Sequence, residues 1–392
     1  MAQAHRAESV EHFQNRLRDV RVAQGLSQGE LAGKSGITRQ AVSAIESHLY
    51  LPTTAVALRL AAALGCHVED LFSLAEAQDV IEGKLIGHLP QRDEKISTVR
   101  VKVARVGTRM VVRPVTELGD VLSFSVPADG YATDIHGQVS GAMVRVNLSR
   151  DRQAIEQEIS VAGCDPAIFL AGAHLRRSKD QTSVVGWTMG SMAALRALQQ
   201  GEVHVAGLHL FDPTTGESNL PFLRRALTGT KYDVVTFATW EEGFLVRPGN
   251  PKSIRVAADL ADPLVTLVNR EEGAGARLML DQRLRTAGID SAHVRGYERI
   301  VSSHFEVARA IASHQADVGI GIRSAAQLFG LDFVPLQAAR YDLVVPKAYL
   351  TSHPTLAHLF DTIVSRPFRA EIDALGGYDT RETGTIHHLR QA

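Results

Sequence analysis

An arginine and a glutamine stand side by side at the start of a short predicted helix, where they can read the edges of DNA bases. Thr38 is a suitable N-cap for this helix, and Arg39 and Gln40 follow it. In a major groove, arginine pairs with guanine and glutamine with adenine through two hydrogen bonds each. Ser43 faces outward on the same helix. This spacing predicts a helix that reads DNA.

A helix, a tight turn and a second helix must hold these side chains in place. Ser27 is a good N-cap for the first helix, and Gly36 can adopt the left-handed conformation that ends it. Apolar residues at core spacing can meet across the turn, namely Leu31, Ile37, Val42 and Ile45. The plainer interpretation is that Arg39 and Gln40 only solvate the outer face of a structural helix.

Further helices are predicted around this unit, over residues 11–24, 53–64 and 68–72. The order and spacing of its motifs then resemble the phage-repressor family, also called Cro-like or XRE helix-turn-helix proteins. The motifs include Leu26-Ser27-Gln28, Ser35-Gly36-Ile37-Thr38-Arg39-Gln40 and Asp70-Leu71-Phe72. A DNA-binding domain over residues 8–75 is therefore expected.

This resemblance implies roles for individual residues of the domain. It implies base or backbone contacts from Gln28, Thr38, Arg39, Gln40 and Ser43. It also implies an ion pair between Arg21 and Glu46 that joins the first helix to the reading helix. Two departures matter: Ala44 replaces a long polar side chain, and His48-Leu49 replaces a glycine and a basic residue, which weakens phosphate binding.

Composition limits the classes of protein that the chain can belong to. Its 392 residues, 45% of them hydrophobic, are enough for several domains with buried cores. The formal net charge of -1 means that any DNA contact depends on a local surface. Only Cys66 and Cys164 are present, which excludes a disulfide scaffold. With no secretory signal and no apolar run long enough to span a bilayer, we expect a cytoplasmic protein with no membrane partner.

The composition of the middle of the chain, residues 76–157, is typical of a small β-rich module. Short valine-rich segments separated by Gly, Pro or Asp predict strands over residues 98–106, 110–115, 121–126 and 142–148. No motif assigns it a chemistry. A spacer or dimerisation module is favoured over an oxoanion-binding module.

From residue 158 to about residue 385, strand-like runs alternate with helical stretches, which predicts an α/β domain with mainly parallel sheets. Ligands of such sheets bind where strands end and helices begin. Polar or small residues occupy four of these junctions and form the candidate ligand site: Cys164, Asp165, Ser191, Asn269, Arg270, Arg277, Ser303 and His304.

The phrases at these junctions resemble solute-binding domains of the molybdate-binding-protein type, in the branch fused to regulators. They include Gly163-Cys164-Asp165-Pro166, His204-Val205-Ala206-Gly207 and Gly249-Asn250-Pro251. The resemblance implies a two-lobed fold like that of type II periplasmic binding proteins, with crossing strands over residues 237–248 and 334–345. It also implies molybdate or tungstate as the effector. Gly321-Ile322 and Ala276 replace a tyrosine and a threonine of relatives, so another small anion is the alternative.

Each candidate also has a purely structural interpretation. Asp165 can cap a helix, and Cys164 can be a small buried residue. Arg270 and Arg277 can pair with Glu271, Glu272 or Asp281 instead of holding an anion. His304 can be a cap neighbour or an inter-lobe latch. The histidines are dispersed, and His204 and His209 lie on a strand without a cysteine or carboxylate beside them, so no metal site is predicted.

The sequence thus predicts a multidomain protein: an all-α helix-turn-helix domain, a β-rich module and a two-lobed α/β domain. The favoured function is a one-component transcriptional regulator that senses a small anion and binds operator DNA as a homodimer on an inverted repeat. No cofactor is predicted. Without a nucleophile elbow or a metal motif, an enzyme acting on a small anionic metabolite is the alternative, as is a DNA-bound protein whose sensor domain is silent.

Overall fold

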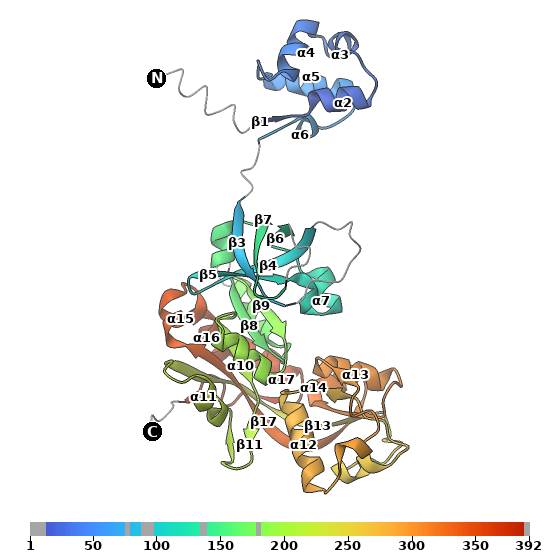
Figure 1. Ribbon diagram of the computed structural model, residues 1–392, viewed down its shortest axis with the longest axis vertical. Helices are drawn as coiled ribbons and strands as arrows, with labels where there is room; N and C mark the ends of the chain where they lie inside the picture. Colours follow the sequence, from blue (N-terminus) through green and yellow to red (C-terminus); the bar gives the residue numbers. More distant parts are fainter. Residues whose placement is uncertain (1–12, 75–78, 88–97, 134–138, 178–181, 388–392) are drawn as a thin grey trace. The chain divides into compact units, whose positions relative to one another are not determined.

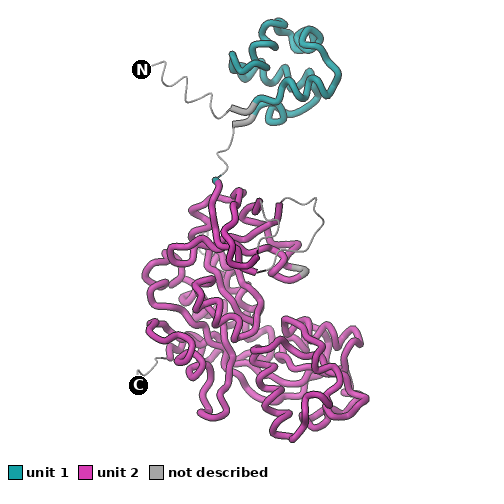
Figure 2. The backbone as a smooth tube through the Cα atoms, in the orientation of Figure 1, with its two compact units in different colours: residues 1–79 teal, residues 80–392 magenta. Residues whose placement is uncertain are grey.

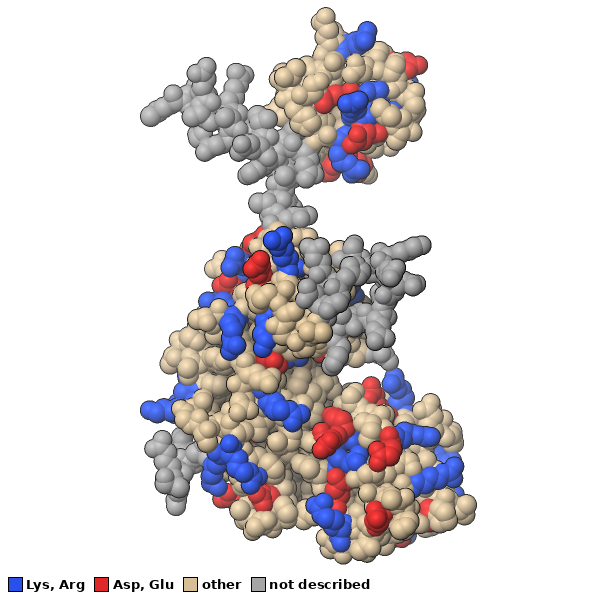
Figure 3. Space-filling view, in the orientation of Figure 1, with Lys and Arg blue, Asp and Glu red and all other residues tan. Residues whose placement is uncertain are grey.

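The structure is a computed structural model that describes residues 13–74, 79–87, 98–133, 139–177 and 182–387. The chain forms two compact units, residues 1–79 and 80–392 (Figure 2). The finer division into residues 8–75, 76–157 and 158–385 stays a prediction. Basic and acidic side chains both appear on the visible face of each unit (Figure 3), in keeping with a net charge close to zero.

Unit 1 is a small helical domain closed by a two-stranded sheet. Its helices are α2 (Leu17–Ala23), α3 (Gln28–Ser35), α4 (Arg39–Glu46), α5 (Thr54–Leu64) and α6 (Val68–Leu71). Strands β1 (Phe13–Asn15) and β2 (Phe72–Leu74) pair antiparallel. The prediction of one helix over residues 11–24 was therefore wrong at its start: residues 11 and 12 lie outside the described residues, and residues 13–15 extend to pair with the end of the unit.

Local capping explains why the helices of unit 1 begin and end where they do. Ser27 and Glu30 form a reciprocal capping box at α3, and Gly36 ends that helix with a φ of 66°. The Thr38 and Thr53 hydroxyls accept backbone hydrogen bonds at the starts of α4 and α5. The apolar faces of these helices meet in one core around Leu17, Leu31, Val42, Ile45 and Leu60, all fully buried.

Unit 2 begins with a closed five-stranded barrel in the order β3-β5-β4-β6-β7. The strands are β3 (Val80–Leu85), β4 (Thr98–Val106), β5 (Arg109–Pro114), β6 (Gly130–Thr133) and β7 (Met143–Leu148), and α8 (Arg152–Glu156) follows them. Residues 121–126 were predicted as a strand, but residues 121–125 belong to helix α7 (Asp120–Ser125), which follows the 3₁₀ helix η1 (Val115–Leu118). A six-residue segment that mixes apolar residues with serine does not distinguish a strand from a short helix, which is why this prediction failed.

The barrel packs directly on the domain that follows it. Lys102 Nζ lies 2.9 Å from a Glu158 carboxylate oxygen, and Arg113 Nη2 lies 3.2 Å from a Glu202 carboxylate oxygen. His204 Nε2 is 2.8 Å from the Arg105 carbonyl oxygen. Trp187 lies under the Arg113 guanidinium, 5.3 Å from its ring centroid. Four side chains of the α/β domain are thus held by barrel residues.

The rest of unit 2 has two lobes. Lobe 1, residues 158–231 and 347–387, has a parallel set of strands β8 (Ile159–Gly163), β9 (Val184–Thr188) and β10 (Val205–Leu208). Its helices are α9 (Ile168–Arg177), α10 (Ser191–Gln199), α11 (Leu220–Ala226), α15 (Lys347–Ser352), α16 (Leu356–Val364) and α17 (Arg366–Ala374). Its short strands are β11 (Phe211–Asp212), β12 (Glu217–Ser218), β18 (Tyr378–Asp379) and β19 (Ile386–His387).

Lobe 2, residues 247–331, is built around a smaller set of strands. These are β14 (Asn269–Arg270), β15 (Ile300–Val301) and β16 (Val318–Ile322). The helices are η2 (Ala257–Ala261), α12 (Gly275–Thr286), η3 (Ser291–His293), α13 (His304–Ala312) and α14 (Arg323–Leu328). Its own core includes Phe244, Leu260, Leu267, Leu280 and Ile320.

Two long strands run through both lobes, β13 (Tyr232–Val246) and β17 (Asp332–Pro346) (Figure 1). They pair antiparallel from Tyr232 opposite Pro346 to Val246 opposite Asp332. The predicted crossings over residues 237–248 and 334–345 fall on them. The larger sheet has the order β16-β13-β17-β10-β8-β9. It is mixed, so the prediction of mainly parallel sheets was wrong: the crossing strands pair antiparallel with each other, with β10 and with β16.

The crossing strands place large aromatic side chains between the lobes. Trp240 and Tyr341 lie 4.8 Å apart between ring centroids, and both are almost fully buried. Two glycines of lobe 1 leave room for the Tyr341 hydroxyl: a Cβ on Gly163 or Gly207 would lie 2.1 or 1.8 Å from it. Among the described residues, none of the helices has both the length and the apolar character needed to cross a membrane.

Candidate functional site

The reading helix α4 presents its polar face to solvent. Arg39 and Gln40 are exposed, and Ser43 is half-buried. The Thr38 hydroxyl accepts the Ala41 amide at 3.1 Å, so Thr38 is the N-cap of the helix as expected. Val42 and Ile45 on the opposite face are fully buried. The geometry suits insertion of one polar helix face into a major groove.

The implied ion pair between α2 and α4 is confirmed. Arg21 Nε lies 2.6 Å from one Glu46 carboxylate oxygen, and Arg21 Nη2 lies 3.0 Å from the other. Gln28 donates from its side-chain amide to the same carboxylate at 2.8 Å. The hydrogen bonds from Arg21 and Gln28 outweigh the effect of burial and lower the pKa of Glu46. Gln28 therefore has a structural contact in addition to the DNA contact predicted for it.

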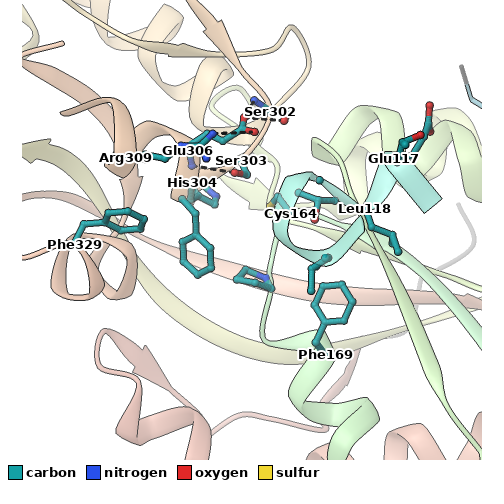
Figure 4. A pocket seen from close by; sticks show the side chains of 16 residues that line it. Glu117, Leu118, Cys164, Phe169, Ser302, Ser303, His304, Glu306, Arg309 and Phe329 are labelled. Carbon is teal, nitrogen blue, oxygen red and sulfur yellow. Dashed lines mark hydrogen bonds and ion pairs between the residues drawn. The ribbon is translucent and has the colours of Figure 1, made fainter. Parts of the chain in front are cut away.

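A cavity of about 600 Å³ opens in unit 2, where the barrel and both lobes meet. Leu118 and Leu122 come from η1 and α7, between barrel strands β5 and β6, Cys164 and Phe169 come from lobe 1, and helix α13 supplies residues of lobe 2. Figure 4 shows Cys164, His304 and Phe169 around this space. Three of the predicted site residues line it, namely Cys164, Ser303 and His304.

Cys164 forms a buried cluster with a histidine from the neighbouring strand. Its Sγ lies 3.3 Å from His209 Nδ1, and Ser191 Oγ lies 3.2 Å from the same nitrogen. On the other side of the ring, His209 Nε2 is 3.5 Å from a Glu242 carboxylate oxygen. Burial alone would lower the pKa of His209, but Cys164 and Glu242 together raise it to about 10. The imidazole of His209 thus lies between the thiol of Cys164 and the carboxylate of Glu242.

His304 completes this cluster from lobe 2. It is the first residue of α13 and is 1% exposed, and neither of its ring nitrogens has a hydrogen-bond partner among the described residues. Burial, followed by the charges of Arg270 and His209, lowers the pKa of His304 well below its ordinary value. Ser303 beside it caps α13 by accepting the Glu306 amide at 3.0 Å.

Asp165 lies beside the cluster and does cap a turn. Its Oδ1 accepts the Ala167 amide and the Tyr378 hydroxyl, each at 2.9 Å, while Oδ2 has no partner within the described residues. Burial raises the pKa of Asp165 to about 6, against the hydrogen bonds from Ala167 and Tyr378. The capping role of Asp165 is thus confirmed, and its contact with a ligand stays a prediction.

The two candidate arginines are ion-paired inside lobe 2. Arg270 makes two hydrogen bonds to Glu271, at 2.8 and 2.9 Å, and one to the Ser302 carbonyl at 3.0 Å. Arg277 Nε bonds Asp281 at 3.2 Å, and its guanidinium lies over the Tyr297 ring. Asn269 donates to the Tyr297 carbonyl at 3.1 Å. None of the three lines the cavity, so the structure favours their structural interpretation over an anion clamp.

His209 and Glu242 were missed by the sequence reasoning. His209 was judged to lie without a cysteine or carboxylate nearby, and this was wrong because Cys164 is 45 positions away in the chain but 3.3 Å away in space. The signal that was present is positional: Cys164 and His209 each directly follow a parallel strand, and β8 and β10 are neighbours in the sheet. Glu242 carried no such signal, since it lies inside a long crossing strand.

Comparison with known proteins identifies both parts of the chain. Residues 17–71 match the helix-turn-helix family model, and residues 172–363 match the PBP superfamily domain. The chain is 34% identical over 228 residues to the uncharacterized protein YvgK of Bacillus subtilis, covering 58% of this chain and 73% of that protein. It is 46% identical over 61 residues to an uncharacterized HTH-type transcriptional regulator of Methanothermobacter thermautotrophicus, covering 15% of this chain and 88% of that protein.

Among solved structures, the sulfate-binding protein SubI from Mycobacterium tuberculosis is similar to the α/β part. It is 18% identical, with a TM-score of 0.43, and the match covers 57% of this chain and 86% of that one. This similarity says nothing about the ligand. The chain belongs to the helix-turn-helix regulators that carry a domain of the periplasmic-binding-protein superfamily.

Proposed function

We propose that this chain is a one-component transcriptional regulator whose helix α4 reads an operator and whose cavity binds a small organic anion. The cavity beside Cys164 and His304 is the observation that carries the proposal. It lies where both lobes and the barrel meet, so a ligand there contacts parts of the molecule that can move against one another. Ligand binding would then favour one arrangement of unit 2 over another.

The lining of the cavity favours an organic anion over a bare oxoanion. Apolar side chains make up much of it, including Leu118, Phe169, Phe305 and Phe329. The positive end of helix α13 begins at the cavity, and the exposed side chain of Arg309 lies on the same helix. Two carboxylates, of Glu117 and Glu306, also line the cavity, and that of Glu306 accepts two hydrogen bonds from Ser302. A carboxylate or phosphate group attached to an apolar body satisfies both parts of this lining. Molybdate and tungstate satisfy only the polar part, and we retain them as the comparison ligands.

The regulator is proposed to act as a homodimer. One helix-turn-helix domain covers a short half-site, and two domains on an inverted repeat supply adequate specificity. We propose that it acts in the cytoplasm, because that is where a regulator meets its operator DNA. A monomer in light scattering, both free and on operator DNA, would contradict the dimer.

The test is a thermal-shift screen of the full chain, followed by DNA binding with every hit. Aromatic and branched carboxylates, phosphorylated metabolites, molybdate, tungstate and sulfate form the panel. We expect a carboxylate or phosphorylated compound to raise the melting temperature and to change operator affinity in an electrophoretic mobility shift. Phe169→Asp is the matched variant, because a carboxylate there, in addition to those of Glu117 and Glu306, should repel an anionic ligand and remove the response. A chain that binds no DNA, or whose operator affinity ignores every hit, would refute the proposal.

One arrangement favours a second candidate, an enzyme with a thiol nucleophile. In space, Cys164 lies beside His209, and His209 lies beside Glu242. This is the arrangement of nucleophile, general base and orienting carboxylate that activates cysteines in enzymes. Release of nitrophenol from an activated ester, lost in Cys164→Ser and kept in Cys66→Ser, would support this candidate. We favour the non-catalytic regulator because its relatives are helix-turn-helix regulators.

A further inference from the structure

We propose that Cys164, His209 and His304 bind one divalent metal ion of the zinc class, in a site that joins the two lobes. The side-chain ligand atoms of these residues all lie within 4.8 Å of one another, and all three side chains are buried. Cys164 Sγ and His209 Nδ1 are 3.3 Å apart. Two ligands of a tetrahedral zinc ion are about 3.5 Å apart, given the usual zinc–sulfur and zinc–nitrogen distances. The Cys164–His209 separation therefore matches coordination, and the ligand atom of His304, which lies within 4.8 Å of the other two, would move closer by up to about 1.3 Å when the ion binds.

The donor set selects the kind of metal. One thiolate and two imidazoles are ligands for zinc and similar transition metals, whereas magnesium and calcium take oxygen ligands. Three protein ligands are also the number found where zinc retains one exchangeable position. Cys164 and His304 both line the cavity, so that position would face the cavity and take a water or an anionic group of a ligand.

The unpartnered atoms of the cluster point to an ion. Both ring nitrogens of His304 are fully buried and lack a hydrogen-bond partner among the described residues. Burying a polar group without a partner is costly, and such groups call for a specific explanation. A metal ion bound by one of these nitrogens supplies it.

Glu242 provides the outer support that a metal-binding histidine normally has. Its carboxylate oxygen lies 3.5 Å from His209 Nε2, while His209 Nδ1 faces Cys164. A carboxylate that accepts the other N–H of a metal-binding histidine fixes the orientation of the ring and makes the histidine a more basic ligand. The thiolate and the Glu242 carboxylate together balance the two positive charges of the ion. Arg270 nearby is already paired with Glu271.

The site would hold the lobes together. Cys164 and His209 belong to lobe 1, His304 begins a helix of lobe 2, and Glu242 lies on a crossing strand. Metal binding would therefore stabilise the closed arrangement of unit 2. The inference does not rest on the proposed function, because metal binding is measured without DNA and without an organic ligand.

The experiment titrates Zn²⁺ into the full chain after chelator treatment, with calorimetry as the readout. We expect one ion per chain. Cys164→Ser and His304→Gln should each weaken binding about 100-fold or more, and Glu242→Gln should weaken it about 10- to 100-fold. Cys66→Ser and His293→Ala are matched controls, because Cys66 lies in unit 1 and His293 is exposed; both should bind as the unaltered chain does.

Cobalt substitution provides a measurement that needs no variant. Co²⁺ bound by Cys164 should give a thiolate-to-metal charge-transfer band and intense visible bands typical of four ligands. Absence of that band in the unaltered chain would overturn the proposal even if the variants fail to fold. Zinc affinity unchanged in Cys164→Ser but lowered in His293→Ala would also overturn it, since the ion would then lie on the surface. A chain that fails to bind DNA would refute the proposed function, but the zinc titration and the cobalt spectrum would still test the metal site.

Discussion

Helix α4 and the cluster around His209 present polar side chains in opposite ways. On α4 the side chains predicted to read bases, Arg39 and Gln40, are exposed and come from adjacent positions of one helix. In the cluster, Cys164, His209 and His304 are buried and come from three distant segments. An exposed site on one helix can change without changing the fold. In a buried cluster, the side chains that bind a ligand also pack the domain, so function and stability change together.

The same substitution should have opposite effects in the two regions. Gly207→Ala in β10 would place a Cβ 1.8 Å from the Tyr341 hydroxyl, and we expect unit 2 to lose about 3 kcal/mol of stability. Gly33→Ala in α3 meets no atom within 4 Å and should stabilise unit 1 by up to about 1 kcal/mol, because alanine favours helices. Urea unfolding followed by circular dichroism measures both. Equal effects would mean that the region around Tyr341 is less tightly packed than described.

The largely buried ion pair between Arg21 and Glu46 in unit 1 should behave like the cluster in unit 2. Arg21→Ala leaves Glu46 without its partner at 2.6 Å, and we expect a loss of about 2 kcal/mol in the free energy of unfolding of unit 1. Lys34→Ala, at an exposed position, should change it by less than about 0.5 kcal/mol. Similar values for the two variants would show that the ion pair contributes little.

Arg39→Ala should separate binding from stability. Loss of a bidentate base contact costs about 1–3 kcal/mol, so we expect operator affinity to fall about tenfold or more and base preference to relax at one position. The melting temperature should stay the same. Selection from random duplexes measures base preference, and fluorescence anisotropy measures operator affinity. Arg59→Ala is the control, because Arg59 is exposed but lies outside α4. An unchanged base preference would refute the role given to this helix.

The smallest expected effect is a pH dependence from His204, which lies in the interface between barrel and lobe 1. Its Nδ1 accepts the Ser160 amide and its Nε2 faces the Arg105 carbonyl, so the folded state holds a neutral ring. Burial, with His353 next, lowers the pKa of His204 to about 3. Because the unfolded chain takes up the proton at a higher pH, stability is lost as the pH falls below about 6.5.

The loss should be about 1 kcal/mol between pH 7.5 and 5.5, measured as the difference between the unaltered chain and His204→Gln. The difference is needed because the raised pKa of Asp165 acts in the opposite direction in both proteins. If the free energy of unfolding changed equally with pH in the two proteins, protonation of His204 would not destabilise the folded state, and the prediction would be wrong.

Local sequence was sufficient to predict the helices of unit 1, apart from the start of the first, and the starts of several helices of unit 2, but not the β1–β2 sheet, whose strands are distant in the sequence. Thr38, Ser191 and Ser303 were placed at or next to helix starts because capping depends on residues three positions apart. The two-lobed fold followed from a resemblance and from alternating strands and helices. The contact of His209 with Glu242 was not predictable, because it depends on how β10, β17 and β13 align in the sheet. Of the two interpretations given for Arg270 and Arg277, the structure shows the pairing with Glu271 and Asp281, and their contact with an anion stays a prediction.

The contacts between barrel and lobe 1 decide where the chain can be divided for study. A fragment that begins at residue 158 would lack Lys102 and Arg113, so Glu158 and Glu202 would lose positive partners that lie 2.9 and 3.2 Å away. Uncompensated carboxylates of this kind favour water entry and aggregation of the fragment. A fragment that begins near residue 80 retains both partners, so crystallisation or calorimetry of unit 2 should use this longer fragment.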